Sequence, residues 1–264
     1  MEILKAVLLG IVQGITEFLP ISSSGHLQIA KEILEVDLEE NLAFDITLHA
    51  ATVLSTLVVL WREVFGLCRG LFSRSFTPEQ SYVLKLAISM IPIGIVGFAF
   101  KEQLNDLLDR SWILVFVGYM LYLTAALLAF AYFFRPREKE TISYRDAFLI
   151  GVAQACAALP GLSRSGTTIA TGLLLGNRRE AVAHFSFLMV LVPILGEMLL
   201  ELCSGELTAG IGTEPLLAGF AAAFVTGCLA CRLMLGIVRR GGLLGFAIYC
   251  LFAGTVSLLT YYYL

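Results

Sequence analysis

The amino-acid sequence is poor in charge. Asp, Glu, Lys and Arg make up 15% of its 264 residues, whereas hydrophobic residues make up 58%. This balance excludes a soluble enzyme, because the surface of a soluble domain carries many more charged groups. The formal net charge is −3 and no block of Lys and Arg is long enough to follow a phosphate backbone, which excludes nucleic acid as a partner. The six cysteines are scattered through mostly apolar runs, so a disulfide framework is excluded as well.

Long apolar runs dominate the rest of the sequence. A helix that spans a bilayer needs about 20 apolar residues. Six runs have about this length and are predicted to be spanning helices: 42–61, 82–100, 112–134, 182–200, 216–238 and 243–264. The sequence therefore predicts an all-α integral membrane protein in which residues 1–264 form a single polytopic domain.

Two further hydrophobic segments, near 3–30 and 146–177, have polar and turn-forming residues at their centres. The first holds Gln13, Glu17, Pro20 and the run Ser22–His26, and the second holds Pro160, Gly161 and the run Ser163–Gly166. A helix that faces lipid does not tolerate such residues, because non-helical backbone at membrane depth needs partners from protein or water. We therefore expect two re-entrant helical hairpins.

The two hairpin segments also resemble each other. Five residues of the first recur 141 positions later: Gly10, Gln13, Ser22, Ser24 and Gly25 match Gly151, Gln154, Ser163, Ser165 and Gly166. This pattern predicts two repeats, each a hairpin plus three spanning helices. Repeat 1 covers about 1–134 and repeat 2 about 146–264, with a cytoplasmic connector near 135–145. The alternative is a chance alignment of common Gly and Ser residues in apolar sequence.

Charged residues between the runs predict the orientation. Arg and Lys gather after the first and third spanning runs and at later junctions: Arg62, Arg69, Arg74, Arg135, Arg137, Lys139, Arg145, Arg178, Arg179, Arg239 and Arg240. These positions are expected in the cytoplasm, which places the ends of the first hairpin outside and those of the second inside. The repeats are then inverted, and both hairpin turns face each other near the bilayer midplane, as in many secondary transporters.

The two turns carry complementary chemistry. Glu17 and Arg164 are charges at membrane depth, which mark a functional site by default. The guanidinium of Arg164 suits phosphate, and small Ser and Gly residues at a helix start leave backbone N–H groups free for an anion. Glu17 and Asp45 offer hard oxygen ligands for Mg²⁺ or Ca²⁺. His26 can move a proton, and a neighbouring serine can attack phosphorus.

Structural roles are the alternatives for several of these residues. Any of the serines can simply cap a helix, the glycines can serve turn geometry, and Glu17 with Arg164 can form a purely structural ion pair. Asp45, His49, Thr52 and Thr56 share one helical stripe, which is either a cavity wall or a contact between helices. For Asp45 we favour a place in the cavity wall, and for His49 both roles stay open.

Two segments, QGITEFLPISSSGH over Gln13–His26 and PGLSRSGTT over Pro160–Thr168, resemble the two signatures of the undecaprenyl-diphosphate phosphatase family, also called bacitracin-resistance proteins. The resemblance implies hydrolysis of undecaprenyl diphosphate to undecaprenyl phosphate and inorganic phosphate. This reaction recycles the lipid carrier for cell-wall synthesis and confers bacitracin resistance, with bacitracin competing indirectly by binding the substrate. The expected location is the bacterial inner membrane, with the active site open to the periplasmic side; a homodimer is left open.

The resemblance also implies site residues. It places Glu17, Ser23, His26 and Arg164 at the catalytic centre, with a divalent cation. The predicted metal ligands are Glu17, Gln13 and Asp45; the family has Glu or Gln at the place of Gln13, so an anionic ligand is not obligatory there. The predicted phosphate-binding residues are Ser22, Ser24, Gly25, Gly161, Ser163, Ser165, Gly166 and Thr167. Ser23 is the preferred nucleophile because it lies 141 positions before Arg164, with His26 as its base; His26 itself and water are the alternatives.

Two other functions compete with this interpretation. A polyprenyl-phosphate flippase or transporter would also have inverted repeats, but it would not require Arg, Glu, His and Ser at one locus. The other large class of membrane lipid-phosphate phosphatases has a P-S-G-H motif and an S-R motif followed by a distal His. Here no Pro precedes Ser24, and His184 is the only histidine after Arg164.

Overall fold

The computed structural model describes residues 2–36, 42–73, 75–108, 110–134, 139–196 and 212–263. In these ranges the regular structure is helical, apart from one isolated bridge between Lys139 and Asn177, which confirms the all-α prediction. The helices are α1 (Ile3–Phe18), α2 (Ser23–Ile33), α3 (Leu42–Val59), α4 (Trp61–Leu71), α5 (Pro78–Ala99), α6 (Lys101–Leu108), α7 (Ile113–Phe133), α8 (Tyr144–Cys156), α9 (Arg164–Leu174), α10 (Arg179–Met189), α12 (Thr213–Arg240) and α13 (Leu243–Tyr263).

Five helical segments are long and apolar enough to cross a bilayer: α5, α7, α12, α13 and the segment Arg179–Gly196, which begins with α10. Helices α3 and α4 pass the same test only as a pair, and they are bent by 79° at the break between them. Counted as one broken span, this pair brings the candidate spans in the described residues to six, the number that the apolar runs predict. Residues 197–200 of one predicted span and 135–138 of the predicted connector lie outside the described residues.

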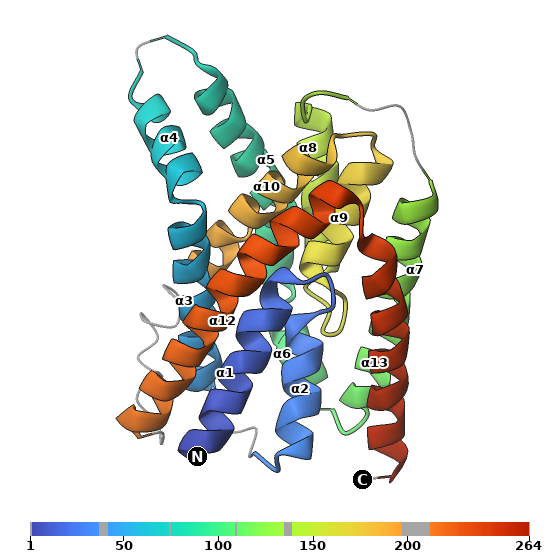
Figure 1. The fold of residues 1–264 in the computed structure, drawn as a ribbon. Helices are drawn as coiled ribbons and strands as arrows, with labels where there is room; N and C mark the ends of the chain where they lie inside the picture. The colour runs from blue at the N-terminus through green and yellow to red at the C-terminus, as the bar shows by residue number, and fades with distance from the viewer. Residues whose placement is uncertain are drawn as a thin grey trace.

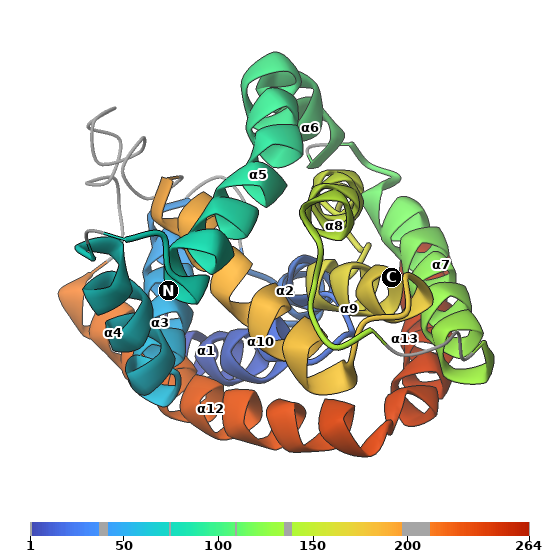
Figure 2. The same cartoon turned by 90° about the horizontal axis from the view of Figure 1, so that it is seen from above.

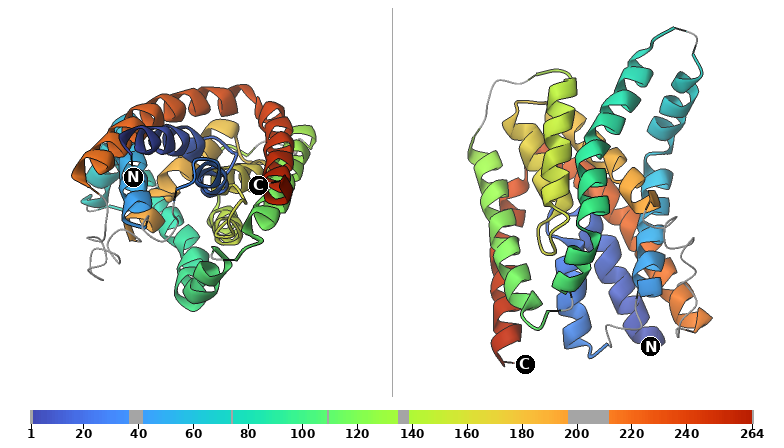
Figure 3. Two further views of the ribbon diagram at one scale, coloured as in Figure 1. Left: turned by 90° about the horizontal axis from the view of Figure 1, so that it is seen from below. Right: turned by 180° about the vertical axis from the view of Figure 1, so that it is seen from behind.

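The two predicted hairpins are present. Helices α1 and α2 have 16 and 11 residues, and α8 and α9 have 13 and 11, so none of the four is long enough to span a bilayer alone. The first hairpin enters from the end of the molecule where both chain termini lie, and the second enters from the opposite end (Figures 1 and 3). Their turns lie between the two ends, inside the protein.

The first hairpin is held by close packing against a long helix. Viewed from above, α1, α2 and α9 lie inside a ring of helices to which α3, α12, α13 and α7 belong (Figure 2). Helix α1 approaches α12 so closely that an added Cβ at Gly10 would collide with the carbonyl oxygen of Gly219, and one at Gly14 with the hydroxyl of Thr226. Small residues allow this approach, as is usual between helices in membranes. The turn of the first hairpin is therefore fixed in depth by α12.

Candidate active site

The turn of the first hairpin is held by a serine cap. Helix α1 ends at Phe18, two residues before Pro20, because proline disfavours helix in the residue before it. Ser22 then caps α2, accepting a hydrogen bond at its Oγ from the backbone N–H of Gly25 at 3.3 Å. The φ angle of Ser22 is 71°, a left-handed conformation that residues other than glycine seldom adopt. The surrounding structure therefore holds this turn in a shape that its own sequence does not favour.

The turn of the second hairpin has the same hydrogen bonds. Ser163 caps α9 and accepts from the N–H of Gly166 at 3.1 Å. The hydroxyl of Ser163 lies 3.4 Å from that of Ser165, and the hydroxyls of Ser22 and Ser24 are 3.3 Å apart in the first turn. Residues 141 positions apart therefore make equivalent contacts, which supports the capping role for Ser22 and Ser163.

The two turns contact each other directly. Ser165 donates its hydroxyl hydrogen to the carbonyl oxygen of Leu19 at 3.0 Å. An added Cβ at Gly25 would lie 3.2 Å from the Cα atom of Gly161, so a larger side chain would push the turns apart. Gly161 also has a φ of 88°, which glycine adopts without strain.

These contacts bear on the predicted phosphate-binding glycines. The backbone N–H groups of Gly25 and Gly166 donate to the capping serines. Gly25, Gly161 and Gly166 are all buried. The geometry favours the alternative that they serve the turns, and their contact with phosphate stays a prediction. Thr167, also predicted to bind phosphate, has a buried hydroxyl without a partner in the described part of the chain.

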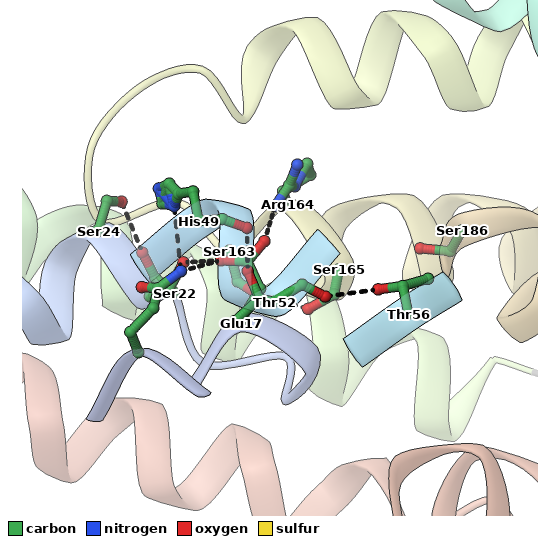
Figure 4. Close-up of polar contacts among 12 residues, drawn as sticks. Glu17, Ser22, Ser24, His49, Thr52, Thr56, Ser163, Arg164, Ser165 and Ser186 are labelled. Carbon is green, nitrogen blue, oxygen red and sulfur yellow. Dashed lines mark hydrogen bonds and ion pairs between the residues drawn. The ribbon is translucent and has the colours of Figure 1, made fainter. Parts of the chain in front are cut away.

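Glu17 lies at the centre of the polar cluster between the turns (Figure 4). One carboxylate oxygen, Oε1, accepts a hydrogen bond from Arg164 Nη2 in an ion pair that joins the two hairpins. The other, Oε2, accepts from the Ser23 hydroxyl at 2.7 Å and from Gln13 Nε2 at 3.0 Å. The side chain of Glu17 is only 3% exposed. Three of the four predicted catalytic residues, Glu17, Ser23 and Arg164, therefore meet at one carboxylate.

The accessible side of this cluster suits an anion. The Arg164 side chain is 24% exposed, and Glu17 is its only hydrogen-bond partner among the described residues. A guanidinium has five N–H donors, so most of them remain available to phosphate oxygens. Ser23 is half-buried and Ser24 is exposed beside it. Arg164 and the Ser23 hydroxyl bind the same carboxylate, so a phosphate bound to Arg164 would lie near the Ser23 hydroxyl.

His26 has no hydrogen bond to Ser23 in the described structure, and its expected role as the base stays a prediction. Its Nδ1 lies 2.8 Å from the carbonyl oxygen of Ser22, and its Nε2 lies 2.9 Å from the hydroxyl of Tyr249. The two rings are also stacked, with centroids 5.5 Å apart. Both nitrogens of His26 are therefore engaged, and the group in contact with the Ser23 hydroxyl is Glu17. Tyr249 was not predicted from the sequence, because a tyrosine within an apolar run gives no signal of a site.

The predicted metal ligands separate into two groups. Gln13 and Glu17 are adjacent, and the amide oxygen Oε1 of Gln13 is buried without a partner in the described residues. Asp45 instead binds the buried Lys31, with Nζ and Oδ2 2.5 Å apart. The described residues contain no group of three or more His, Cys, Asp or Glu side chains that could hold a metal. Only Gln13 and Glu17 of the predicted ligands are therefore adjacent, and a hard divalent cation held there would take its other ligands from phosphate and water, whereas Asp45 is bound to Lys31.

Comparisons with known proteins agree with the two sequence signatures. Residues 6–256 match the family described as bacitracin resistance protein BacA. A protein of Bacteroides fragilis is 55% identical over 262 residues, which is 98% of each chain, and one of Parabacteroides distasonis is 57% identical over 258 residues, 96% of each. A more distant protein, from Methanosphaera stadtmanae, is 33% identical over 276 residues, 98% of each. All three are named undecaprenyl-diphosphatase. With a match over almost its whole length, the chain belongs to the bacitracin resistance protein BacA family.

Proposed function

We propose that the chain is an undecaprenyl-diphosphatase. It is a multi-pass membrane protein, and its substrate is a polyprenyl diphosphate lipid, hydrolysed to undecaprenyl phosphate and inorganic phosphate. The reaction regenerates the lipid carrier for cell-wall synthesis and confers resistance to bacitracin. The observation that carries the proposal is the buried Glu17 carboxylate, which binds the Ser23 hydroxyl of one hairpin and the Arg164 guanidinium of the other. A nucleophile, a base and a phosphate-binding cation thus share one locus.

The geometry suggests a covalent route. Ser23 Oγ attacks the terminal phosphorus while Glu17 Oε2, 2.7 Å away, takes the hydroxyl proton. The bond between this phosphorus and the bridging oxygen breaks, undecaprenyl phosphate leaves, and phosphoserine remains. Water then adds to the phosphorus, the bond to Ser23 breaks, and Glu17 returns its proton to the serine oxygen. Inorganic phosphate is released and the site is restored.

Arg164 has two tasks in this scheme. Its bond to Glu17 holds the carboxylate in place, and its remaining donors bind the phosphoryl oxygens on which charge accumulates. The ion pair is largely buried, and removing either partner of such a pair costs about 3–5 kcal/mol because it leaves an uncompensated charge. A substitution at either position therefore has to be checked for folding before its activity is interpreted.

We propose that Gln13 and Glu17 hold a divalent cation, Mg²⁺ or Ca²⁺, between the protein and the diphosphate. Such a cation, when bound, neutralises negative charge on the phosphate oxygens. The variant Glu17→Gln keeps the side-chain shape but loses the charge. It should lower the rate of phosphate release and weaken its dependence on added Mg²⁺. An unchanged dependence on Mg²⁺ would remove Glu17 from the cation's ligands.

We further propose that the protein lies in the inner membrane as two inverted repeats, with the site open to the periplasm. The opposite entry of the hairpins and their equivalent caps support this arrangement. In a background without the native cysteines, a cysteine at Gly212 should react with an impermeant thiol reagent outside intact cells, and one at Ser75 should not. The reverse result would invert the orientation.

Phosphate release from purified protein in detergent micelles tests the function, because micelles offer no second leaflet to which a lipid could be moved. Undecaprenyl diphosphate should yield inorganic phosphate, and a short polyprenyl diphosphate measures the chain-length preference. Added bacitracin should slow the reaction, and excess substrate should restore it. Lipid movement in vesicles without phosphate release would favour the flippase instead. Light scattering on the same sample measures whether the protein is a monomer or a homodimer.

A further inference from the structure

His49 shares a hydrogen-bond donor with the carboxylate at the centre of the site. The nitrogen Nε2 of Gln13 lies 3.0 Å from Glu17 Oε2 and 3.1 Å from His49 Nδ1. An amide nitrogen has two hydrogens and no lone pair that accepts, so it donates one hydrogen to each neighbour. The contact therefore requires His49 Nδ1 to be an acceptor, which places the proton of the neutral ring on Nε2.

The two acceptors together fix the orientation of the Gln13 amide. With the amide reversed, its oxygen would face a carboxylate oxygen and a ring nitrogen, and an interaction between two acceptors is repulsive. In the observed orientation Oε1 makes no hydrogen bond to either neighbour and is buried without a partner among the described residues. Buried acceptors are rarely left unsatisfied unless they serve a ligand or another function. The unpartnered oxygen therefore points to a ligand next to Glu17.

We infer that His49, on α3, is a positioning residue of the active site. It acts through Gln13: the Nδ1 acceptor holds the amide so that its nitrogen steadies Glu17 and its oxygen is presented to the cation and diphosphate. His49 lies outside both signature segments. This inference rests on the proposed function, and it extends the site from the two hairpins to α3.

A matched pair of variants tests the acceptor alone. Asparagine and leucine have nearly the same shape, but His49→Asn keeps an acceptor attached to Cγ, where the histidine has Nδ1, and His49→Leu has none. We expect His49→Leu to lower kcat at least tenfold with KM within about twofold, and His49→Asn to stay within about threefold of the wild type. In a Gln13→Ala background, His49→Leu should have little further effect, because the residue through which it acts is gone. His49→Ala repeats the comparison if the leucine variant does not fold.

The outcomes separate this inference from the proposed function. Equal kcat values for the leucine and asparagine variants, or a full tenfold loss on adding His49→Leu to Gln13→Ala, would overturn the role of His49. If the wild type releases no phosphate, the proposed function fails, and the rise in thermal unfolding midpoint on adding Mg²⁺ still tests the inference. That rise should be present in the wild type and in His49→Asn and reduced in His49→Leu. With turnover absent, no rise in the wild type would refute the positioning role as well.

Discussion

Replacing Ser23 with alanine tests the proposed nucleophile. The substitution removes the hydroxyl that donates to Glu17 Oε2 at 2.7 Å and leaves the rest of the cluster intact. Glu17 keeps its bonds from Gln13 and Arg164, so no buried charge loses its only partner. The substitution therefore removes a reacting atom with little effect on the fold.

The structure sets the expected size of the two effects. For stability, the variant loses one hydrogen bond to a charged group. Such a bond contributes about 1.5–3 kcal/mol to the free energy of unfolding. Here the remaining donors limit the loss to the lower part of that range. For activity, the covalent route is closed, and we expect turnover to fall more than 100-fold, about 2.7 kcal/mol in the activation free energy. Substrate binding through Arg164 should persist.

The assay is phosphate release from undecaprenyl diphosphate by purified wild type, Ser23→Ala and Ser24→Ala, with thermal unfolding of each sample as the check on folding. Ser24 is an exposed neighbour whose hydroxyl contacts only Ser22 among the described residues, so its variant should keep at least about a tenth of the activity. If Ser23→Ala also keeps more than about a tenth, a loss under 1.4 kcal/mol, covalent catalysis by Ser23 is refuted. Water activated at the same place would then be the better candidate.

Three further predictions concern single contacts. Arg164→Lys keeps the positive charge but loses the planar pair of N–H donors, and phosphate release should fall at least tenfold, about 1.4 kcal/mol in activation free energy. A near-normal rate would show that Arg164 contributes only its charge. Tyr249→Phe keeps the stacked ring but removes the hydroxyl from His26 Nε2, and because Glu17 is the base in the proposed route, kcat should stay within about twofold, under about 0.5 kcal/mol; a loss of about tenfold or more would return His26 to the catalytic centre. Gly14→Ala places a Cβ against α12, and the overpacking should cost about 1–3 kcal/mol of stability and so lower the thermal unfolding midpoint. Gly94→Ala on α5, with open space around it, should leave the midpoint unchanged, and equal midpoints for the two variants would contradict the packing.

The sequence was sufficient to predict the two hairpin turns and a site formed by Glu17 and Arg164, because both follow from the cost of polar groups in hydrocarbon; the ion pair between the two side chains was only the structural alternative. Turn-forming residues inside an apolar segment require a protected turn, and charges at membrane depth mark a functional site by default. The lengths of the apolar runs also predicted the spanning helices. The break after α3 was not predicted, because the apolar run 42–61 passes through it without interruption.

Contacts between distant helices could not be read from the sequence. His26 was expected to act as the base for Ser23, three residues earlier, but its ring faces α13 and its Nε2 lies next to the Tyr249 hydroxyl. Asp45 was expected at the metal because its carboxylate offers hard oxygen ligands, whereas the fold brings Lys31 Nζ to 2.5 Å from its Oδ2. In both cases the local chemistry was suitable, and the partner was decided by how the helices pack.

The ion pair between the hairpins also constrains how the protein is made. Glu17 and Arg164 are separated by 147 positions, so the carboxylate is synthesised long before its partner. At about 5–20 residues per second, a ribosome needs roughly 7–30 s to cover that distance. During this interval the first hairpin carries the Glu17 carboxyl group without the Arg164 guanidinium that pairs with it in the folded protein. We therefore expect it to remain near the membrane surface, or protonated, until the second hairpin emerges, so that insertion of the first half is completed by synthesis of the second.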